Sequence, residues 1–311
     1  MRVLEAGAPA TGGDLTLRSV TAMLLLAVIW GLSIPATKLG LVTMPPLTLT
    51  ALRFLVAAPL LMIVAFDRLR VPRRALPRIA ALGVLGISLG QAMQAFGVEG
   101  TSASAGTIIS ATIPVFVVVF AALRLKQPVS VLQGLGLLAA FAGIALVALE
   151  NSGDATGSRT TLAGVVLMLL SALAIAFYYV WSVQLTEEFG TRAVAAWSTL
   201  LGFLALLPFA VWEIARTPFQ ITAQAMWVAV YLGAAVTVAG LLLWLYLLRK
   251  VPARVAASVQ YLQPVFGIAA SAALFGDKLG LLFGAGVVLI LAGLALAVAN
   301  RPAPKEAVPH E

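Results

Sequence analysis

The sequence predicts an all-α polytopic membrane protein with ten transmembrane helices, built as two inverted five-helix repeats. The first observation is composition: 61% of the 311 residues are hydrophobic and 10% are charged, whereas soluble domains contain about 45–50% apolar and about 25% charged residues. The second is a series of apolar runs, each close to the roughly 20 residues that cross a bilayer. The third is an internal repeat. These features leave no length for a separate soluble catalytic or nucleic-acid-binding domain.

Ten apolar runs, divided by charged and turn residues, give the expected spans in chain order. They cover approximately residues 19–38, 46–66, 75–98, 102–123, 129–149, 162–184, 193–212, 223–248, 253–275 and 279–299. An even number of spans places both termini on the same side of the membrane. A signal peptide is the competing interpretation of the first run. It is disfavoured because the run is long, has no clear small-x-small cleavage site and ends in Pro35 and Lys38.

The distribution of Lys and Arg orients the chain, because cytoplasmic loops carry an excess of these residues. With the N-terminus inside, fifteen of the 20 basic residues fall in inner segments and three, Arg159, Arg216 and Lys278, fall in outer loops. The sequence therefore predicts cytoplasmic tails over residues 1–18 and 300–311. The net charge of +8 reflects these short basic clusters and no continuous basic face, so nucleic acid is not an expected partner.

The chain repeats itself at an offset of 150 residues, which is the distance from Pro114 to Pro264. Each proline begins a Pro-Val-Phe run. Glycines recur at the same offset, starting from Gly83, Gly90, Gly134, Gly136 and Gly143. The two units cover residues 19–149 and 162–299 and hold five spans each. Because five is odd, the second unit enters the membrane from the opposite side, which is typical of secondary transporters that alternate access around a midplane site.

Three local features support a family resemblance: Trp30-Gly31 followed by Lys38, the Ala51-Leu52-Arg53-Phe54 element, and the two Pro-Val-Phe runs. With them the chain resembles the EamA family of the drug/metabolite transporter superfamily, ten-helix carriers built from two EamA repeats, over about residues 19–299. Family members often carry a Glu just after the fourth and ninth spans, where this chain has Gln127 and Asp277. The resemblance implies a bacterial inner-membrane exporter of amino acids, aromatic ones included, or of other small metabolites.

Polar and aromatic side chains recur deep in the expected spans. Amides and indoles are unfavourable toward lipid, so we expect them to face the interior of the bundle. An aromatic wall with a few hydrogen-bonding groups suits a small amphipathic solute. The predicted substrate-binding residues are therefore Trp30, Gln91, Gln94, Ser110, Tyr178, Gln260, Tyr261 and Gln263.

Pro114 and Pro264 lie near the middle of the fourth and ninth spans, where a proline clashes with the carbonyl four residues earlier. Those carbonyls belong to Ser110 and Gln260. A freed acceptor at membrane depth must be satisfied by protein or by a water-filled cavity. The two helix kinks are expected either to form a pair of polar notches facing a central cavity or simply to help the bundle pack.

Two basic residues lie within or at the end of expected spans. Arg53 is about seven residues into the second span, roughly 10 Å below its outer boundary, and a guanidinium there needs a partner. Glu99, at the outer end of the third span, is the nearest candidate carboxylate, so we expect either an Arg53–Glu99 pair or a bond to a helix-end carbonyl. Arg53 is expected to be either a structural tie between helices or a hook for a substrate carboxylate. Lys38 either snorkels to the headgroups or attracts substrate.

Several chemistries are disfavoured by what the chain lacks. No acidic residue lies in the middle of a span, there is no cysteine, and the single histidine is His310 in the tail. We therefore expect no metal, cofactor or intramembrane catalytic group, and no phosphate loop is present. The sequence favours facilitated export of a small-molecule substrate across the lipid bilayer. The protein is expected to be a monomer or a homodimer. A flippase for a lipid-linked sugar and a proton-driven exporter of amphipathic drugs or metabolites are the alternatives.

Overall fold

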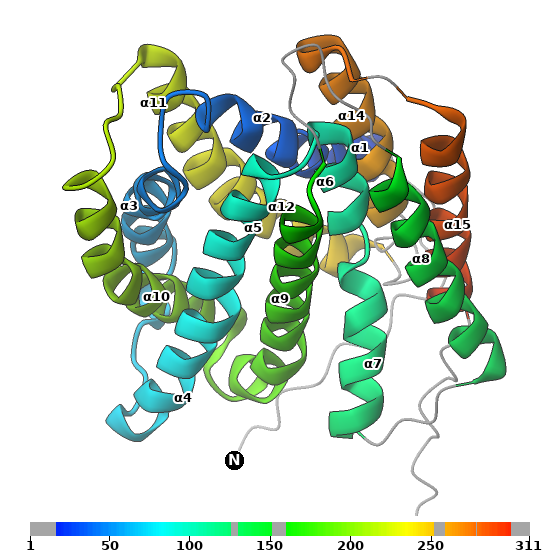
Figure 1. Ribbon diagram of the computed structural model, residues 1–311. Helices are drawn as coiled ribbons and strands as arrows, with labels where there is room; N and C mark the ends of the chain where they lie inside the picture. Colours follow the sequence, from blue (N-terminus) through cyan, green and yellow to red (C-terminus); the bar gives the residue numbers. More distant parts are fainter. Residues whose placement is uncertain (1–16, 126–129, 151–159, 252–258, 278, 300–311) are drawn as a thin grey trace, which may run out of the picture.

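The computed structural model describes residues 17–125, 130–150, 160–251, 259–277 and 279–299, and every regular element in them is helical (Figure 1). The helices in the first repeat are α1 (Leu17–Gly31), α2 (Ser33–Gly40), α3 (Pro46–Val64), α4 (Leu76–Ala81), η3 (Leu82–Ser88), α5 (Leu89–Glu99), α6 (Ala103–Ser110), α7 (Ile113–Leu125) and α8 (Val131–Leu149). Those in the second are α9 (Leu162–Phe189), α10 (Thr191–Ile214), α11 (Ala223–Val230), η4 (Tyr231–Ala239), α12 (Gly240–Lys250), α14 (Val259–Phe275) and α15 (Leu281–Ala299). Two short turns, η1 (Phe66–Arg68) and η2 (Arg73–Ala75), join α3 to α4.

The helices confirm the prediction of an all-α polytopic membrane protein. Eight helical stretches are long and apolar enough to cross a membrane. Two shorter apolar helices, Leu262–Phe275 and Leu281–Leu296, occupy the positions of the last two expected spans. Most of the predicted tails, and the beginning of the ninth span, lie outside the described residues.

The first and fourth spans are each divided into two helices, whereas in the second repeat α9 is continuous and α14 runs unbroken over its described residues, Val259–Phe275. In the first span the division falls between Gly31 and Ser33, and Pro35 follows in the first turn of α2. A proline there would clash with the Gly31 carbonyl if the helix continued. In the fourth span the helix stops at Ser110, before Pro114. The kink expected at Pro114 is therefore a break of two residues, Ala111 and Thr112, across which backbone hydrogen bonds continue.

Side-chain hydroxyl groups accompany the break before Pro114 and are absent from the equivalent positions before Pro264. Ser110 Oγ donates to the Thr107 carbonyl at 2.8 Å, and Thr112 Oγ1 donates to the Ile109 carbonyl at 2.6 Å. The same two carbonyls also accept the backbone N–H groups of Ala111 and Thr112, and added hydroxyl bonds of this kind often bend a helix. The equivalent positions in the ninth span are Gln260 and Leu262, which carry no hydroxyl, and α14 runs through Pro264 unbroken.

The third span of each repeat contains a π-helical segment at nearly the same place. Segments η3 and η4 overlap when they are compared at the 150-residue offset. Each packs on the second span of the other repeat, because Gly83 lies against the Ser198 carbonyl of α10 and Gly233 lies against the Arg53 carbonyl of α3. A side chain at either glycine would collide with backbone. The two repeats thus cross at matching, closely packed points.

Helices α8 and α15 lie together along one side of the bundle (Figure 1). Gly143 of α8 lies against the backbone of Gly286 and Ile290, and Gly293 of α15 lies against the backbone of Gly136. These close approaches fit the small-residue packing that the glycine spacing predicts. The remaining helices enclose the polar interior.

Candidate substrate site

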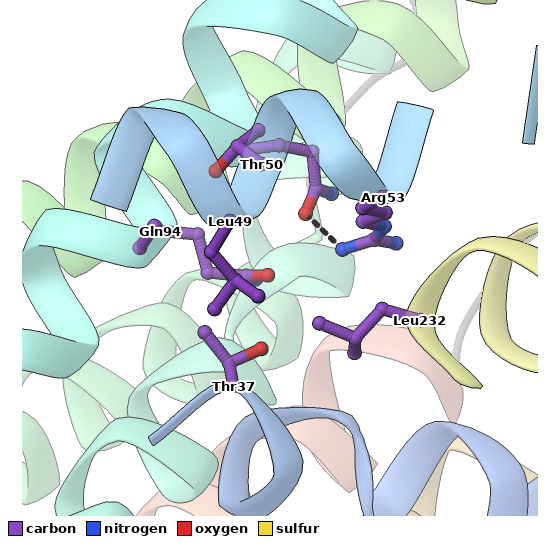
Figure 2. Close-up of a pocket in the computed structure, with 8 residues that line it drawn as sticks. Thr37, Leu49, Thr50, Arg53, Gln94 and Leu232 are labelled. Carbon is purple, nitrogen blue, oxygen red and sulfur yellow. Dashed lines mark hydrogen bonds between the residues drawn. The ribbon is translucent and has the colours of Figure 1, made fainter. Parts of the chain in front are cut away.

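A small polar cavity lies between α2, α3, α5 and η4 (Figure 2). The centre of a water molecule can occupy about 10 Å³ of it, which is room for about one water. Most of the side chains around it carry hydrogen-bonding groups. The lining residues are Thr37, Leu49, Thr50, Arg53, Gln91, Gln94, Ala95 and Leu232.

Arg53 is the only charged residue that lines this cavity, and it is 9% exposed. Its Nη1 donates to Gln91 Oε1 at 2.6 Å, the bond drawn in Figure 2, and its Nε donates to Thr237 Oγ1 at 3.1 Å. Thr237 in turn donates to the Leu232 carbonyl inside the π-helical segment. The second terminal nitrogen of Arg53 has no hydrogen-bond partner among the described residues and is not sealed from solvent. The guanidinium is therefore held in place by two hydrogen bonds, while the N–H groups of its second terminal nitrogen have no partner among the described residues.

Tyr179 marks an open space inside the bundle at the level of Arg53. The two side chains are close enough to interact electrostatically. Tyr179 is 48% exposed, yet it lies nine residues after the exposed Leu170 in α9. Nine residues are about two and a half helical turns, so the two side chains point in opposite directions. Because Leu170 is on the outer face, the exposed Tyr179 faces the interior.

Trp30 joins α1 to the same π-helical segment that positions Arg53. Its Nε1 donates to the Val236 carbonyl at 3.0 Å, and its ring lies 6.0 Å from the ring of Trp244. Tyr231 closes the same junction by donating to the Ile29 carbonyl at 2.7 Å. Trp30 therefore binds the backbone next to Thr237, the residue that holds Arg53, although neither tryptophan lines the cavity.

The other predicted binding residues lie in separate pairs. The hydroxyl groups of Tyr178 and Ser198 share a hydrogen bond of 3.2 Å, and Gln263 Nε2 donates to Gln260 Oε1 at 2.9 Å. The Gln263 carbonyl also lies against Gly31, next to Trp30. Ser110 bonds within its own helix, as described above, and the side chain of Tyr261 lies outside the described part of the structure. Of the predicted set, the structure brings Gln91 and Gln94 to the Arg53 cavity.

Lys38 forms a structural tie between helices, and Glu99 does not pair with Arg53 among the described residues. Lys38 is buried, and its Nζ donates to the carbonyls of Val98, Glu99 and Thr101 at 3.0, 3.1 and 2.7 Å. An ammonium at the C-terminal end of α5 interacts favourably with the helix dipole, so it neither snorkels nor faces the cavity. The expected Arg53–Glu99 partnership is replaced by the neutral partners Gln91 and Thr237.

Charged residues at the Lys38 end of the bundle bind helix termini across the two repeats. Glu213, at the end of α10, accepts from the backbone N–H of Leu47 and from both the N–H and the hydroxyl of Thr48, at the start of α3. Asp277 accepts from the N–H of Ser104 at 2.7 Å. Glu150 accepts from the N–H of Phe283 at the start of α15. Carboxylates at helix N-termini are stabilising, so this end of the bundle is fastened.

Sequence reasoning missed the threonines of the site. Thr37 and Thr50 line the cavity and Thr237 holds Arg53, but no pattern in the sequence distinguishes them from other threonines in apolar helices. Glu213 was also unassigned, because a carboxylate at a span end is an ordinary boundary residue. Their roles depend on which helices become neighbours.

A bundle of membrane-crossing helices in two repeats, with polar groups gathered in its interior, defines an internal-repeat membrane transporter. The sequence profile of the EamA-like transporter family matches residues 17–149 and 162–299, one copy on each repeat. The chain belongs to this family.

Curated relatives agree over most of their length. A protein described as a probable amino-acid metabolite efflux pump of Salmonella typhimurium is 30% identical over 287 residues, covering 88% of this chain and 93% of its own. A probable terminal-alkyne amino-acid exporter of Streptantibioticus cattleyicolor is 28% identical with the same coverage. A solved crystal structure with 18% identity has the same fold, with a TM-score of 0.62 over 91% of this chain and 96% of that one.

Proposed function

We propose that this protein is a plasma-membrane carrier that exports small carboxylate-bearing metabolites, amino acids foremost, by alternating access around the Arg53 cavity. The observation that carries the proposal is Arg53: a buried guanidinium that lines an internal cavity, is fixed by neutral partners and has one terminal nitrogen without a partner among the described residues. Intramembrane charges of this kind mark substrate pathways. The descriptions of the Salmonella and Streptantibioticus relatives point to the same substrate class.

The bias of Lys and Arg supports an orientation with both termini in the cytoplasm and the Lys38 end outside. In that orientation the fastened end is the outer one. The carrier would then be in a state closed to the outside, ready to load substrate from the cytoplasm. Transport without a coupled proton fits the positions of the acidic residues, all of which lie in tails, loops or span ends.

Counterflow in proteoliposomes tests the proposal. Purified protein is reconstituted into vesicles loaded with an unlabelled amino acid, and entry of the same labelled amino acid is measured with and without a pH gradient. We expect exchange that is indifferent to the gradient. A signal that requires the gradient would favour a proton-driven exporter. If no amino acid in the panel is exchanged, amino-acid export is contradicted, and other metabolites or a lipid-linked substrate become the favoured candidates.

A further inference from the structure

We infer that the Arg53 site recognises the carboxylate of its substrate and offers no ion pair to an ammonium group. Its substrate class then includes monocarboxylate anions without a charged amino group, such as N-acyl amino acids and 2-oxo acids, and the membrane potential drives their export. The inference deepens the proposed function and rests on it.

The first step is the missing counter-ion of Arg53. Both of its hydrogen-bond partners, Gln91 and Thr237, are neutral. The ion pairs found among the described residues join Asp67 to Arg68 and Arg192, at the other end of the bundle. A buried charge without a partner is unfavourable, so the site favours an anion that supplies the missing charge.

The second step is the position of the acidic residues. In the described part of the chain, Glu150, Glu213 and Asp277 are bound to helix termini at the Lys38 end. Glu99 ends α5 at the same end, and the remaining acidic residues, Asp67, Glu187 and Glu188, lie at the other. The interior therefore presents amides, hydroxyls and aromatic rings to a substrate amino group. An ammonium gains no ion pair there.

The third step is the shape of the recognition groups. Guanidinium presents its N–H groups as a planar fork that matches a carboxylate, and one terminal nitrogen of Arg53 is free of protein partners in the described structure. Gln94 lines the same cavity, and its amide bonds to none of the described residues. Trp30, whose ring lies 6.0 Å from that of Trp244, binds the backbone next to Thr237, so an aromatic pair adjoins the segment that holds Arg53. A carboxylate matches the free guanidinium nitrogen and the Gln94 amide, and the cavity, which has room for about one water here, must widen to admit the rest of the substrate.

The driving force follows from the charge that moves. A zwitterion crosses the membrane without net charge, whereas a monocarboxylate carries one negative charge outward, in the direction that an inside-negative potential favours. One elementary charge gives a tenfold ratio for about each 59 mV, or about fifty-fold for 100 mV. Export of such an anion needs no coupled proton.

The test uses the full-length protein in proteoliposomes with a potassium diffusion potential set by valinomycin. Three labelled probes are compared: phenylalanine, N-acetylphenylalanine and phenethylamine, which lacks the carboxylate. We expect N-acetylphenylalanine to approach an inside-to-outside ratio of about one to fifty at 100 mV, inside negative. Phenylalanine should exchange without a response to the potential, and phenethylamine should not be carried.

Variants connect the result to Arg53. Arg53→Gln should abolish transport of N-acetylphenylalanine, whereas Arg53→Lys should keep the response to potential with a higher KM, because the charge remains and the fork is lost. Arg216→Gln is the control, since Arg216 is exposed at the Lys38 end and remote from the cavity. Thermal melting of each purified variant shows whether it folds. If Arg53→Gln does not fold, Arg53→Lys and the comparison of the three probes still test the inference.

The outcomes separate the inference from the proposed function. Phenylalanine exchange without N-acetylphenylalanine transport would overturn the inference and leave amino-acid export standing. Transport of N-acetylphenylalanine that ignores the potential would overturn electrogenic export. If neither compound moves, amino-acid export itself is wrong.

Discussion

Arg53 connects the two repeats through its side chain, because Gln91 belongs to the first repeat and Thr237 to the second. The bond to Thr237 fixes the direction of the guanidinium toward the cavity. Thr237 itself is tied to the Leu232 carbonyl. The orientation of the single cavity charge therefore depends on one hydroxyl from the opposite repeat.

Removing that hydroxyl is the most direct test at this scale. In Thr237→Val, Nε of Arg53 loses its acceptor. A hydrogen bond to a charged group contributes about 1.5–3 kcal/mol, so we expect the KM for transport to rise roughly tenfold or more with the protein still folded. Thr21→Val is the matched control, because Thr21 donates to a carbonyl of its own helix at an exposed site. Equal KM values in both variants would contradict the positioning role of Thr237.

Gln263 provides a second residue-level prediction. Its amide bonds to Gln260, and its backbone lies beside Gly31 at the crossing of α1 and α14. We expect Gln263→Ala to reduce initial transport rates at unchanged membrane expression. Gln184→Ala, at an exposed amide bound to Arg124, should transport normally. Normal flux in Gln263→Ala would remove this residue from the site.

At the scale of elements, the carboxylates at the Lys38 end act on helix termini rather than on other side-chain charges. Glu213 satisfies two backbone N–H groups at the start of α3, where Pro45 and Pro46 provide no side-chain cap. The first N–H groups of a helix have no partner within it. Glu213 thereby fastens α10 to α3.

Glu213→Gln should weaken this connection. An amide presents one oxygen and no charge, and loss of a helix cap costs about 0.5–2 kcal/mol, which corresponds to about 2–4 °C of Tm for each kcal/mol. We expect a lower Tm for Glu213→Gln in thermal melts of the purified protein. Glu187→Gln, at an exposed position of α9, should melt like the unmodified chain. Matching Tm values for the two variants would show that the contact adds no stability.

The pair α8 and α15 allows a comparison between two glycines of one helix. A methyl group at Gly143 would meet the Gly286 carbonyl and Ile290, whereas one at Gly134 would meet open space. We expect Gly143→Ala to destabilise the protein by about 1–3 kcal/mol. Gly134→Ala should be neutral or add up to about 1 kcal/mol, because alanine favours helix. Thermal melting of both variants measures the difference, and a stable Gly143→Ala would contradict the close packing.

The spans could be predicted from the sequence because their length and apolar composition are local properties. The interruptions could not be predicted fully. Pro114 and Pro264 are equivalent in the sequence, yet a helix begins just before the first and α14 runs through the second, a difference that accompanies the hydroxyl groups of Ser110 and Thr112. In the same way, the depth of Arg53 was visible, but its partner Thr237 lies 184 residues away in the chain. Such partners depend on packing between repeats.

At the scale of the whole molecule, the orientation in the membrane can be tested with single introduced cysteines, because the chain has no native cysteine that must first be replaced. Single cysteines are introduced by Thr217→Cys, just after α10, and by Glu188→Cys near the end of α9. In intact cells a membrane-impermeant maleimide should label only the first. The second should react after permeabilisation. The reverse pattern would contradict cytoplasmic termini.

The unequal division of the spans bears on kinetics. If the two inverted repeats were identical, exchanging their conformations would convert the inward-facing state into a two-fold-related copy of the outward-facing state. The substrate would then bind equally well from either side of the membrane. Here the breaks after Gly31 and Ser110 have no counterpart at the equivalent positions of α9 and α14, and the arginine of the cavity belongs to the first repeat. The two states are therefore chemically different. Half-saturation should differ between the two faces of the membrane, while the gradients alone continue to set the direction of net flow.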